Sequence, residues 1–398
     1  MIGPSLSRWA ALPLVLIVAD VSGPPPAPPG RTAKPLPADS AVPAAARPPP
    51  ESVEVRLLLI GDPGDPAPGS EPVLAALAAR AAQGPVARTL ILFLGDIVYP
   101  HGLPDSTDPD RAEAERRLNA QLDVLRSTGV RGLFVPGNHD WDAHGDDGWQ
   151  AVIRLGRYIE AHSGGRFALL PGGGCPGPAI VDLGTAVRLV LLDTQWWLHE
   201  GPKPEGPASG CAVASQQAVL DSLRGALRGA GGRHVAVVGH HALESGGPHG
   251  GHFGWQAHIF PLRSVNSWLW IPLPGLGSIY PLARQQGVSN QDLSGPRYRR
   301  LRAGLDSVFA EQPPLVYASG HDHSLQVLAG ETARYLVVSG SGYYGHASRV
   351  ARLDHTRFAL EASGYMQLDV VKSGRVRLGV LVVDQAGRAT EAFSMWLD

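Results

Sequence analysis

The chain has 398 residues, of which 44% are hydrophobic and 7% aromatic, and its formal net charge is −2. This length and apolar content are sufficient for one large domain or a few smaller ones. The near-neutral charge and the lack of a basic run argue against nucleic acid as a partner.

The N-terminus combines a short apolar run with a proline-rich segment. Trp9–Ala19 is an apolar run of 11 residues, which is too short for a transmembrane helix because that needs about 20. We expect residues 1–21 to be a secretory signal peptide or an uncleaved N-terminal anchor, with no stable membrane span in the mature form. Residues 22–51 should be a disordered linker and residues 52–398 the folded domain. The sequence therefore predicts an exported protein, periplasmic or secreted.

The chain has two cysteines, Cys175 and Cys211. In an exported protein this pair can form one disulfide, and the alternative is two free thiols. Neither residue has a neighbouring cysteine with which it could bind a metal, so we expect a structural role.

The first half of the folded region alternates between segments typical of strands and of helices. Residues 90–94 are consecutive apolar residues, as in a strand buried on both faces. Leu118, Leu122 and Leu125 recur on one face of an amphipathic helix. The predicted elements are a strand at 53–60, a helix at 71–83, a strand at 88–95, a helix at 111–126 and a strand at 132–136. This order predicts βαβ units around a mainly parallel sheet.

The second half continues this alternation and then changes. Its predicted elements are a strand at 187–193, a helix at 215–228, a strand at 234–238, a helix at 297–310 and a strand at 315–318. From 324 to 398 the sequence has alternating apolar segments with glycine turns and no convincing helix. We expect these segments to be antiparallel strands that complete a second sheet.

Residue types that bind metals follow five of the predicted strands. In open α/β sheets, ligands bind beyond the carboxyl ends of the strands, and a glycine there lets the chain turn sharply toward the cleft. The residues are Asp62, Asp96 with Tyr99, Asn138 with His139, His240, and His321 with His323. One polar residue at a strand end means little, but five strand ends in succession, each with a preceding glycine, indicate a metal site.

These strand ends resemble the motifs of the calcineurin-like metallophosphoesterases, most closely those of the purple acid phosphatase branch. The family pattern is GDxG, GDxxY, GNH(D/E), VxxH and GHxH. The matching segments are Gly61-Asp62-Pro63-Gly64, Gly95-Asp96-Ile97-Val98-Tyr99, Gly137-Asn138-His139-Asp140, Val237-Val238-Gly239-His240 and Gly320-His321-Asp322-His323. The resemblance implies an α/β sandwich of two stacked mixed β-sheets flanked by helices.

The resemblance also implies a site for two metal ions. The first ion would be held by Asp62, Asp96, Tyr99 and His323, and the second by Asp96, Asn138, His240 and His321. Carboxylate and phenolate oxygens suit Fe(III), whereas an amide oxygen and two imidazoles suit Fe(II), Zn(II) or Mn(II). The expected reaction is hydrolysis of a small phosphorylated substrate, a phosphomonoester, by a metal-bound hydroxide. The alternatives are hydrolysis of phosphodiesters on the same core and a non-catalytic cell-envelope binding protein.

Three further residues are expected to act on the substrate. By resemblance, His139 contacts the phosphate or protonates the leaving group, and Asp140 orients the His139 ring. His249 resembles a histidine that faces the leaving group in small purple acid phosphatases, and the alternative is a solvated loop residue. His241 and His252 are weaker candidates. The other histidines are expected at the surface or in packing: His101, His144, His162, His199, His234, His258, His346 and His355.

Residues 253–290 are an aromatic insertion, rich in glycine and proline, between two strands that carry predicted ligands. The insertion shows no helical period. We expect a lid over the active site that selects substrates, with Trp268 and Trp270 as the residues to test. The alternatives are an ordinary packed loop and a patch that contacts a membrane.

Overall fold

A computed structural model of the chain describes residues 45–264 and 269–397. The predicted signal segment, most of the predicted linker and Trp268 lie outside these residues. Among the residues described, none of the helices combines the length and the apolar character that a bilayer span requires. The chain already contacts the folded domain before Ser52, because the Ala45 carbonyl accepts hydrogen bonds from Arg377 and Ser394.

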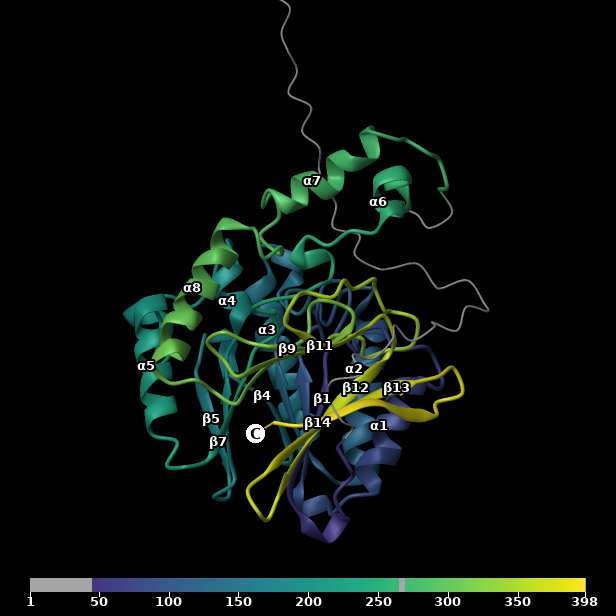
Figure 1. The fold of residues 1–398 in the computed structure, drawn as a ribbon. Coiled ribbons are helices and arrows are strands. Elements are labelled where there is room, and N and C mark those ends of the chain that lie inside the picture. The colour runs from purple at the N-terminus through teal and green to yellow at the C-terminus, as the bar shows by residue number, and fades with distance from the viewer. Residues whose placement is uncertain (1–44, 265–268, 398) are drawn as a thin grey trace, which may run out of the picture.

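The fold is a sandwich of two β-sheets with helices outside both (Figure 1). The first sheet has seven strands in the order β14 (Ala389–Trp396), β13 (Val376–Val383), β12 (Gly364–Val371), β1 (Val53–Ile60), β2 (Thr89–Leu94), β3 (Arg131–Val135) and β4 (Phe167–Leu169). The second also has seven, in the order β11 (Thr356–Leu360), β9 (Leu325–Ala329), β10 (Tyr335–Ser339), β8 (Val316–Ser319), β7 (His234–Val238), β6 (Val187–Leu191) and β5 (Ala179–Leu183). Both sheets are mixed, as predicted.

The long apolar strand runs arise because the central strands are covered on both faces. In β1, Leu57 and Leu59 face the core between the sheets, whereas Leu58 and Ile60 pack toward the helical layer. β2 pairs with β1 in parallel, with Leu58 opposite Ile91, and it alternates in the same way. Each fully buried side chain of this kind contributes about 1.5–3 kcal/mol. This two-sided burial holds the carboxyl ends of the parallel strands in place.

Eight helices cover and connect the sheets in the part of the chain that the structure describes. They are α1 (Pro72–Ala82), α2 (Arg111–Thr128), α3 (Gly148–Ser163), α4 (Thr194–Leu198), α5 (Gln216–Arg228), α6 (Trp255–Ile259), α7 (Ile279–Gln285) and α8 (Pro296–Glu311). α1 and α2 pack together on the side of the first sheet, and α5 and α8 on the side of the second (Figure 1). α3, α4 and the short strands β4 and β5 are not among the elements predicted from the sequence.

Two expectations differ from the structure. The strands of residues 324–398 do not complete a single sheet: β9–β11 belong to the second sheet and β12–β14 to the first. The sequence pattern cannot tell these partners apart, because an apolar strand can be buried in either sheet, and β12 is buried along its whole length. The insertion at 253–290 is also not free of helix, since it contains the short helices α6 and α7.

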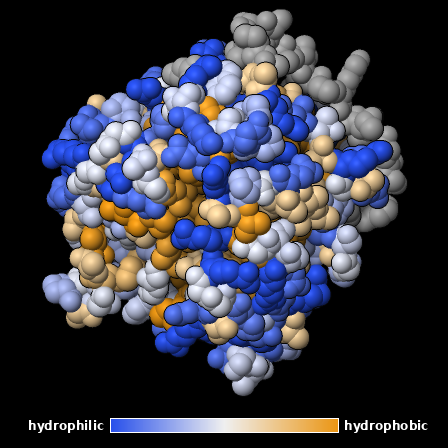
Figure 2. Space-filling view, turned by 90° about the horizontal axis from the view of Figure 1, so that it is seen from below, coloured by the Kyte–Doolittle hydropathy of each residue, from blue (hydrophilic) through white to orange (hydrophobic). Residues whose placement is uncertain are grey.

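The insertion stands at one end of the sandwich (Figure 1). Its surface is unusually apolar, and its exposed large side chains include Trp255, Trp270, Leu276, Ile279 and Leu282. The opposite end of the molecule is largely hydrophilic, with apolar residues gathered in its middle (Figure 2).

The disulfide is present between Cys175 and Cys211, whose Cα atoms lie 5.6 Å apart.

Candidate metal centre

The five strand ends named from the sequence meet at one end of the sandwich. They follow β1, β2 and β3 of the first sheet and β7 and β8 of the second. Backbone hydrogen bonds join them, since Asp62 N–H donates to the Gly95 carbonyl at 3.0 Å and Gly320 N–H to the His240 carbonyl at 3.0 Å. Residues distant in the sequence are thereby brought into one buried cluster.

Three of the gathered residues have a strained backbone. Asp62, Asp96 and His321 have φ values of 58°, 52° and 69°, a left-handed region that non-glycine residues rarely adopt. Close approach also requires glycine at position 137, because a Cβ atom there would collide with Asp96 Oδ1. The strand ends therefore bring their polar side chains together at a conformational cost of about 1–3 kcal/mol per strained residue.

A first cluster forms around the Tyr99 hydroxyl. Tyr99 Oη lies 3.3 Å from Asp62 Oδ1, 3.1 Å from Asp96 Oδ2 and 3.4 Å from His323 Nε2. His323 Nε2 is 3.6 Å from Asp62 Oδ1. The first cluster thus contains the four residues predicted for the first ion.

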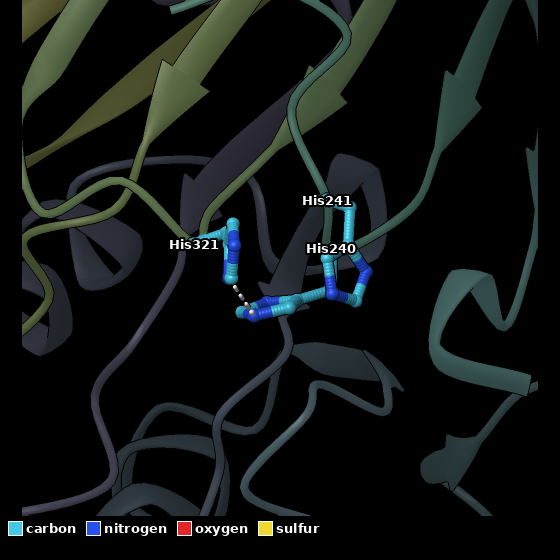
Figure 3. Close-up of side chains that lie close together, drawn as sticks. All are labelled: His240, His241 and His321. Atoms are coloured by element: carbon cyan, nitrogen blue, oxygen red, sulfur yellow. Dashed lines mark hydrogen bonds between the residues drawn. The ribbon is translucent and has the colours of Figure 1, made fainter. Parts of the chain in front are cut away.

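A second cluster forms around Asn138. Its Oδ1 lies 2.9 Å from His240 Nε2 and 3.1 Å from His321 Nδ1, and those two nitrogens are 3.3 Å apart. Figure 3 shows the rings of His240 and His321 pointing toward one another. Asp96 Oδ1 lies 3.4 Å from His240 Nε2. The two clusters therefore share Asp96, with one carboxylate oxygen facing each.

The hydrogen bonds behind the two histidines fix their ring tautomers. His240 Nδ1 lies 2.8 Å from the Leu94 carbonyl, and His321 Nε2 lies 2.8 Å from the Gln291 carbonyl. A carbonyl only accepts, so these nitrogens must carry the hydrogens. His240 Nε2 and His321 Nδ1 consequently present lone pairs to the second cluster, as metal-binding histidines do.

The donor atoms of both clusters fit a bound cation. Lone pairs of two imidazoles, an amide oxygen and a carboxylate face one another in the second cluster, and they repel unless a positive charge lies between them. Two ligands bound at about 2.1 Å and at right angles on one ion lie about 3 Å apart. The separations in the second cluster are close to that spacing. Asn138 Oδ1 lies 2.9 Å and 3.1 Å from the two histidine nitrogens, those nitrogens are 3.3 Å apart, and Asp96 Oδ1 is 3.4 Å from His240 Nε2.

The electrostatics of the protein alone disfavour charge on most side chains in this place; at Asp96 burial raises the pKa, but His240 and His139 outweigh it and lower the pKa. Burial and the neighbouring Asp96 raise the pKa of Asp62 well above its usual value. Burial and the neighbouring carboxyl groups of Asp96 and Asp62 also raise the pKa of Tyr99 well above its usual value. Burial lowers the pKa of His321 and His323 well below the ordinary value. A bound cation would favour the deprotonated forms of Asp62 and Tyr99, whereas the low pKa of the two histidines already favours the neutral ring that binds a metal.

His139 and Asp140 occupy different roles in the structure. His139 Nδ1 donates to the Pro100 carbonyl at 2.6 Å, and its Nε2 lies 3.9 Å from Asp96 Oδ2. The Asp140 carboxylate accepts hydrogen bonds from three backbone N–H groups, and the expectation that it orients the His139 ring stays a prediction. The donors are Ile97, Val98 and Gly137. Asp140 joins the loops that carry Asp96 and Asn138.

His249 lies against the second cluster. Its ring centroid is 4.0 Å from that of His321, and its Nδ1 lies 3.1 Å from Asp292 Oδ1 and 3.0 Å from the Gln291 carbonyl. Burial lowers the pKa of His249, but the bond to Asp292 outweighs it and raises the pKa above the usual value. The residues directly after the insertion therefore hold this histidine beside the site.

Sequence reasoning missed three participants. Gln291 and Asp292 follow the insertion and carry no motif of their own. His346, predicted as a surface or packing residue, is buried, and its Nε2 lies 3.4 Å from Tyr99 Oη. One signal for His346 was available. It lies in the loop after β10, and β10 runs parallel to β8, the strand that His321 and His323 follow. His241 is buried beside the second cluster, but its nitrogens face Thr194 Oγ1 and Gln291 Oε1.

A comparison with known families decides the relationship. The family described as calcineurin-like phosphoesterase matches residues 55–325. The chain belongs to this family. The calcineurin-like phosphoesterases are metal-dependent phosphoric ester hydrolases that bind two metal ions, so the predicted resemblance is confirmed at the level of the family. No curated protein matches the sequence.

Solved structures with a similar fold have low sequence identity. Purple acid phosphatase PPD1 from seeds of yellow lupin (Lupinus luteus) has a TM-score of 0.52 and 14% identity, and the match covers 86% of this chain but 53% of the lupin chain. PhoD has a TM-score of 0.52 and 12% identity, with coverages of 86% and 69%. GAP50, the anchor in the inner membrane complex of Plasmodium, has a TM-score of 0.48 and 14% identity, with coverages of 86% and 88%. The similarities to the lupin phosphatase and to PhoD concern the fold alone.

Proposed function

We propose that this calcineurin-like phosphoesterase is a two-metal phosphomonoesterase of the purple acid phosphatase type. The observation that supports this most directly is the sharing of Asp96, whose Oδ2 faces the first cluster and whose Oδ1 faces the second. Two ions held by these clusters would clamp a phosphate group and supply a nucleophile near neutral pH. The donor types favour Fe(III) at the first cluster and Fe(II), Zn(II) or Mn(II) at the second.

Two histidines would act on the substrate itself. The bond from His139 Nδ1 to the Pro100 carbonyl orients the ring with Nε2 3.9 Å from Asp96 Oδ2, which would place His139 beside a phosphate bound at the two clusters. The bond from His249 Nδ1 to Asp292 leaves Nε2 to hold the proton for the departing oxygen. A positioned acid of this kind typically contributes about 10²–10⁴-fold in rate.

Substrate assays on metal-replete protein test the proposal. We expect higher kcat/KM on phosphomonoesters than on matched phosphodiesters. Asp96→Asn should lower activity at least about hundredfold, which corresponds to about 3 kcal/mol, and should reduce the content of both metals. The control is Asp182→Asn, because Asp182 is a partly exposed carboxylate paired with Arg188.

Two outcomes would replace the proposal. Faster hydrolysis of diesters would assign the centre to phosphodiesterase chemistry. Stoichiometric metal binding without turnover of either class would indicate a binding protein of the cell envelope. In iron-loaded protein, a phenolate of Tyr99 should give a visible charge-transfer band that Tyr99→Phe removes. Colourless iron-loaded protein would contradict the assignment to the purple acid phosphatase type, but not the proposed phosphoesterase activity.

We further propose that the protein is exported. Disulfides persist in oxidising compartments, and the Cys175–Cys211 disulfide agrees with the apolar run at Trp9–Ala19. Fractionation of the native host with an antibody to the folded domain tests this, and a cytoplasmic protein with reduced cysteines would contradict it.

A further inference from the structure

His346 faces the first cluster although it belongs to none of the five motifs. It lies in the loop after β10 and is 1% exposed. Its Nε2 is 3.4 Å from Tyr99 Oη, the same distance that separates His323 Nε2 from that oxygen. The two imidazoles are in contact, with centroids 3.7 Å apart and ring planes tilted by 36°. His346 is thus placed around Tyr99 in the way that the predicted ligands of the first ion are.

Hydrogen bonding accounts for only part of this arrangement, because a hydroxyl donates one hydrogen bond and two carboxylates compete for it. Tyr99 has one hydroxyl hydrogen, but Asp62, Asp96, His323 and His346 all turn an acceptor or a ring nitrogen toward its oxygen. The distance of 3.4 Å is also longer than the usual 2.7–3.2 Å of an N–H···O bond. The other ring nitrogen, His346 Nδ1, is buried and has no hydrogen-bond partner among the residues described.

Burial of a ring nitrogen without a hydrogen-bond partner, as at His346 Nδ1, is unfavourable. An ion bound to the Nε2 lone pair would offset the cost of burying the ring in this place. The stacking partner on the other side is the Tyr343 ring, with centroids 4.2 Å apart. Packing against Tyr343 holds the imidazole in the orientation that ligation needs.

We propose that His346 is a fifth protein ligand of the first metal position, beside Asp62, Asp96, Tyr99 and His323. The proposal rests on the two-metal centre proposed above. A second imidazole would make the first position richer in nitrogen than the predicted set of two carboxylates, one phenolate and one histidine. Imidazole suits Zn and divalent iron, so the first position should also accept Zn(II) or Fe(II).

The test measures metal binding and needs no turnover. His346→Phe keeps a ring between His323 and Tyr343 but removes both nitrogens. We expect it to weaken Zn(II) binding at one of two positions by at least about tenfold, since even outer partners of ligands contribute about 10–100-fold. Zn(II) titration calorimetry and metal content after dialysis would measure this. Tyr343→Phe is the matched control, because it keeps the stacked ring and should bind as wild type.

A double variant separates ligation from a hydrogen bond to Tyr99. If His346 only donates to the tyrosine oxygen, His346→Phe should have no further effect in a Tyr99→Phe background. A ligand should still cost at least about tenfold in Zn(II) affinity there. Equal unfolding midpoints of the metal-free proteins would show that the fold is intact, and if they differ, His346→Gln replaces the phenylalanine variant.

The outcomes distinguish this inference from the function it rests on. Wild-type protein that binds two Zn(II) ions, with His346→Phe unchanged in both backgrounds, overturns the role of His346 and leaves the two-metal centre intact. Wild-type protein that binds no metal overturns both.

Discussion

At the scale of single residues, the site combines strained ligands with a buried carboxylate that holds their loops together. Asp140 accepts from Ile97 N–H at 2.9 Å, Val98 N–H at 3.1 Å and Gly137 N–H at 2.8 Å. It therefore joins the end of β2 to the end of β3. Because Asp96 has a positive φ, its position depends on such external bonds.

Asp140→Asn should accordingly destabilise the protein. An amide retains one acceptor oxygen but turns an NH₂ group toward a backbone N–H, and a buried donor left without its acceptor costs about 1–3 kcal/mol. We expect the free energy of unfolding of the metal-free protein in urea to fall by about 1–3 kcal/mol. Asp123→Asn is the control, because its carboxylate is 67% exposed and should change stability by about 0.5 kcal/mol or less. Unchanged stability with lost activity would instead return Asp140 to a catalytic role.

At the scale of elements, the segment from α7 to Asp292 links the insertion to the site. Arg284 Nε donates to Asp292 Oδ2 at 2.9 Å, and Asp292 Oδ1 holds His249. The next residue back, Gln291, fixes His321 through its carbonyl. One short stretch thus orients both a predicted ligand and a predicted acid, which couples the position of the insertion to the chemistry.

Asp292→Asn should therefore slow the release of poor leaving groups selectively. Protonation by His249 matters most for an alkyl phosphate, because an alkoxide is a poor leaving group. We expect kcat on alkyl phosphates to fall about tenfold or more, with a smaller loss on p-nitrophenyl phosphate. Asp221→Asn is the control, since its carboxylate is 61% exposed and distant from these contacts. Equal losses on both substrates would indicate a structural role only.

The exposed apolar side chains of the insertion suggest how substrates are chosen. Trp255 and Trp270 are 57% and 52% exposed, and an aromatic ring offers a large area to an apolar leaving group. We predict that Trp255→Ala and Trp270→Ala lower kcat/KM about tenfold on esters of bulky apolar alcohols, and change it little on small ones. Ile180→Ala is the matched control, because Ile180 is 47% exposed on β5. An unchanged substrate profile would remove the lid interpretation.

At the scale of the whole molecule, the sequence predicted best what two-sided burial and local motifs determine. Strands such as β1 and β2 are apolar on both faces because sheets and helices cover them, so their runs are long and unambiguous. The ligands follow these strands directly and carry their own glycines. His346, Gln291 and Asp292 depend instead on how loops fold back over the sheet edge. The division of β9–β14 between two sheets depends on strand pairing, which period-2 patterns leave open.

Stability of the whole molecule should fall in mild acid, and His199 is one cause. This side chain is buried against Trp141, with centroids 4.9 Å apart, and neither ring nitrogen has a hydrogen-bond partner among the described residues. Burial, followed by the neighbouring His144 and Lys203, lowers the pKa of His199 to about 4. An unfolded histidine has a pKa of about 6.5.

Below about pH 6.5 the unfolded chain therefore binds a proton at His199 that the folded protein does not, and stability decreases as pH falls toward 4. Between pH 7.5 and 4.5 this single group should cost the wild type about 2–3 kcal/mol. His199→Phe keeps a buried ring without a titrating nitrogen, so its unfolding free energy should fall less than that of wild type over the same range. Urea unfolding at the two pH values, with the exposed His162→Gln as control, measures the difference. Parallel pH dependences of wild type and His199→Phe would show that the ring protonates equally in both states, and that other buried groups govern the acid sensitivity.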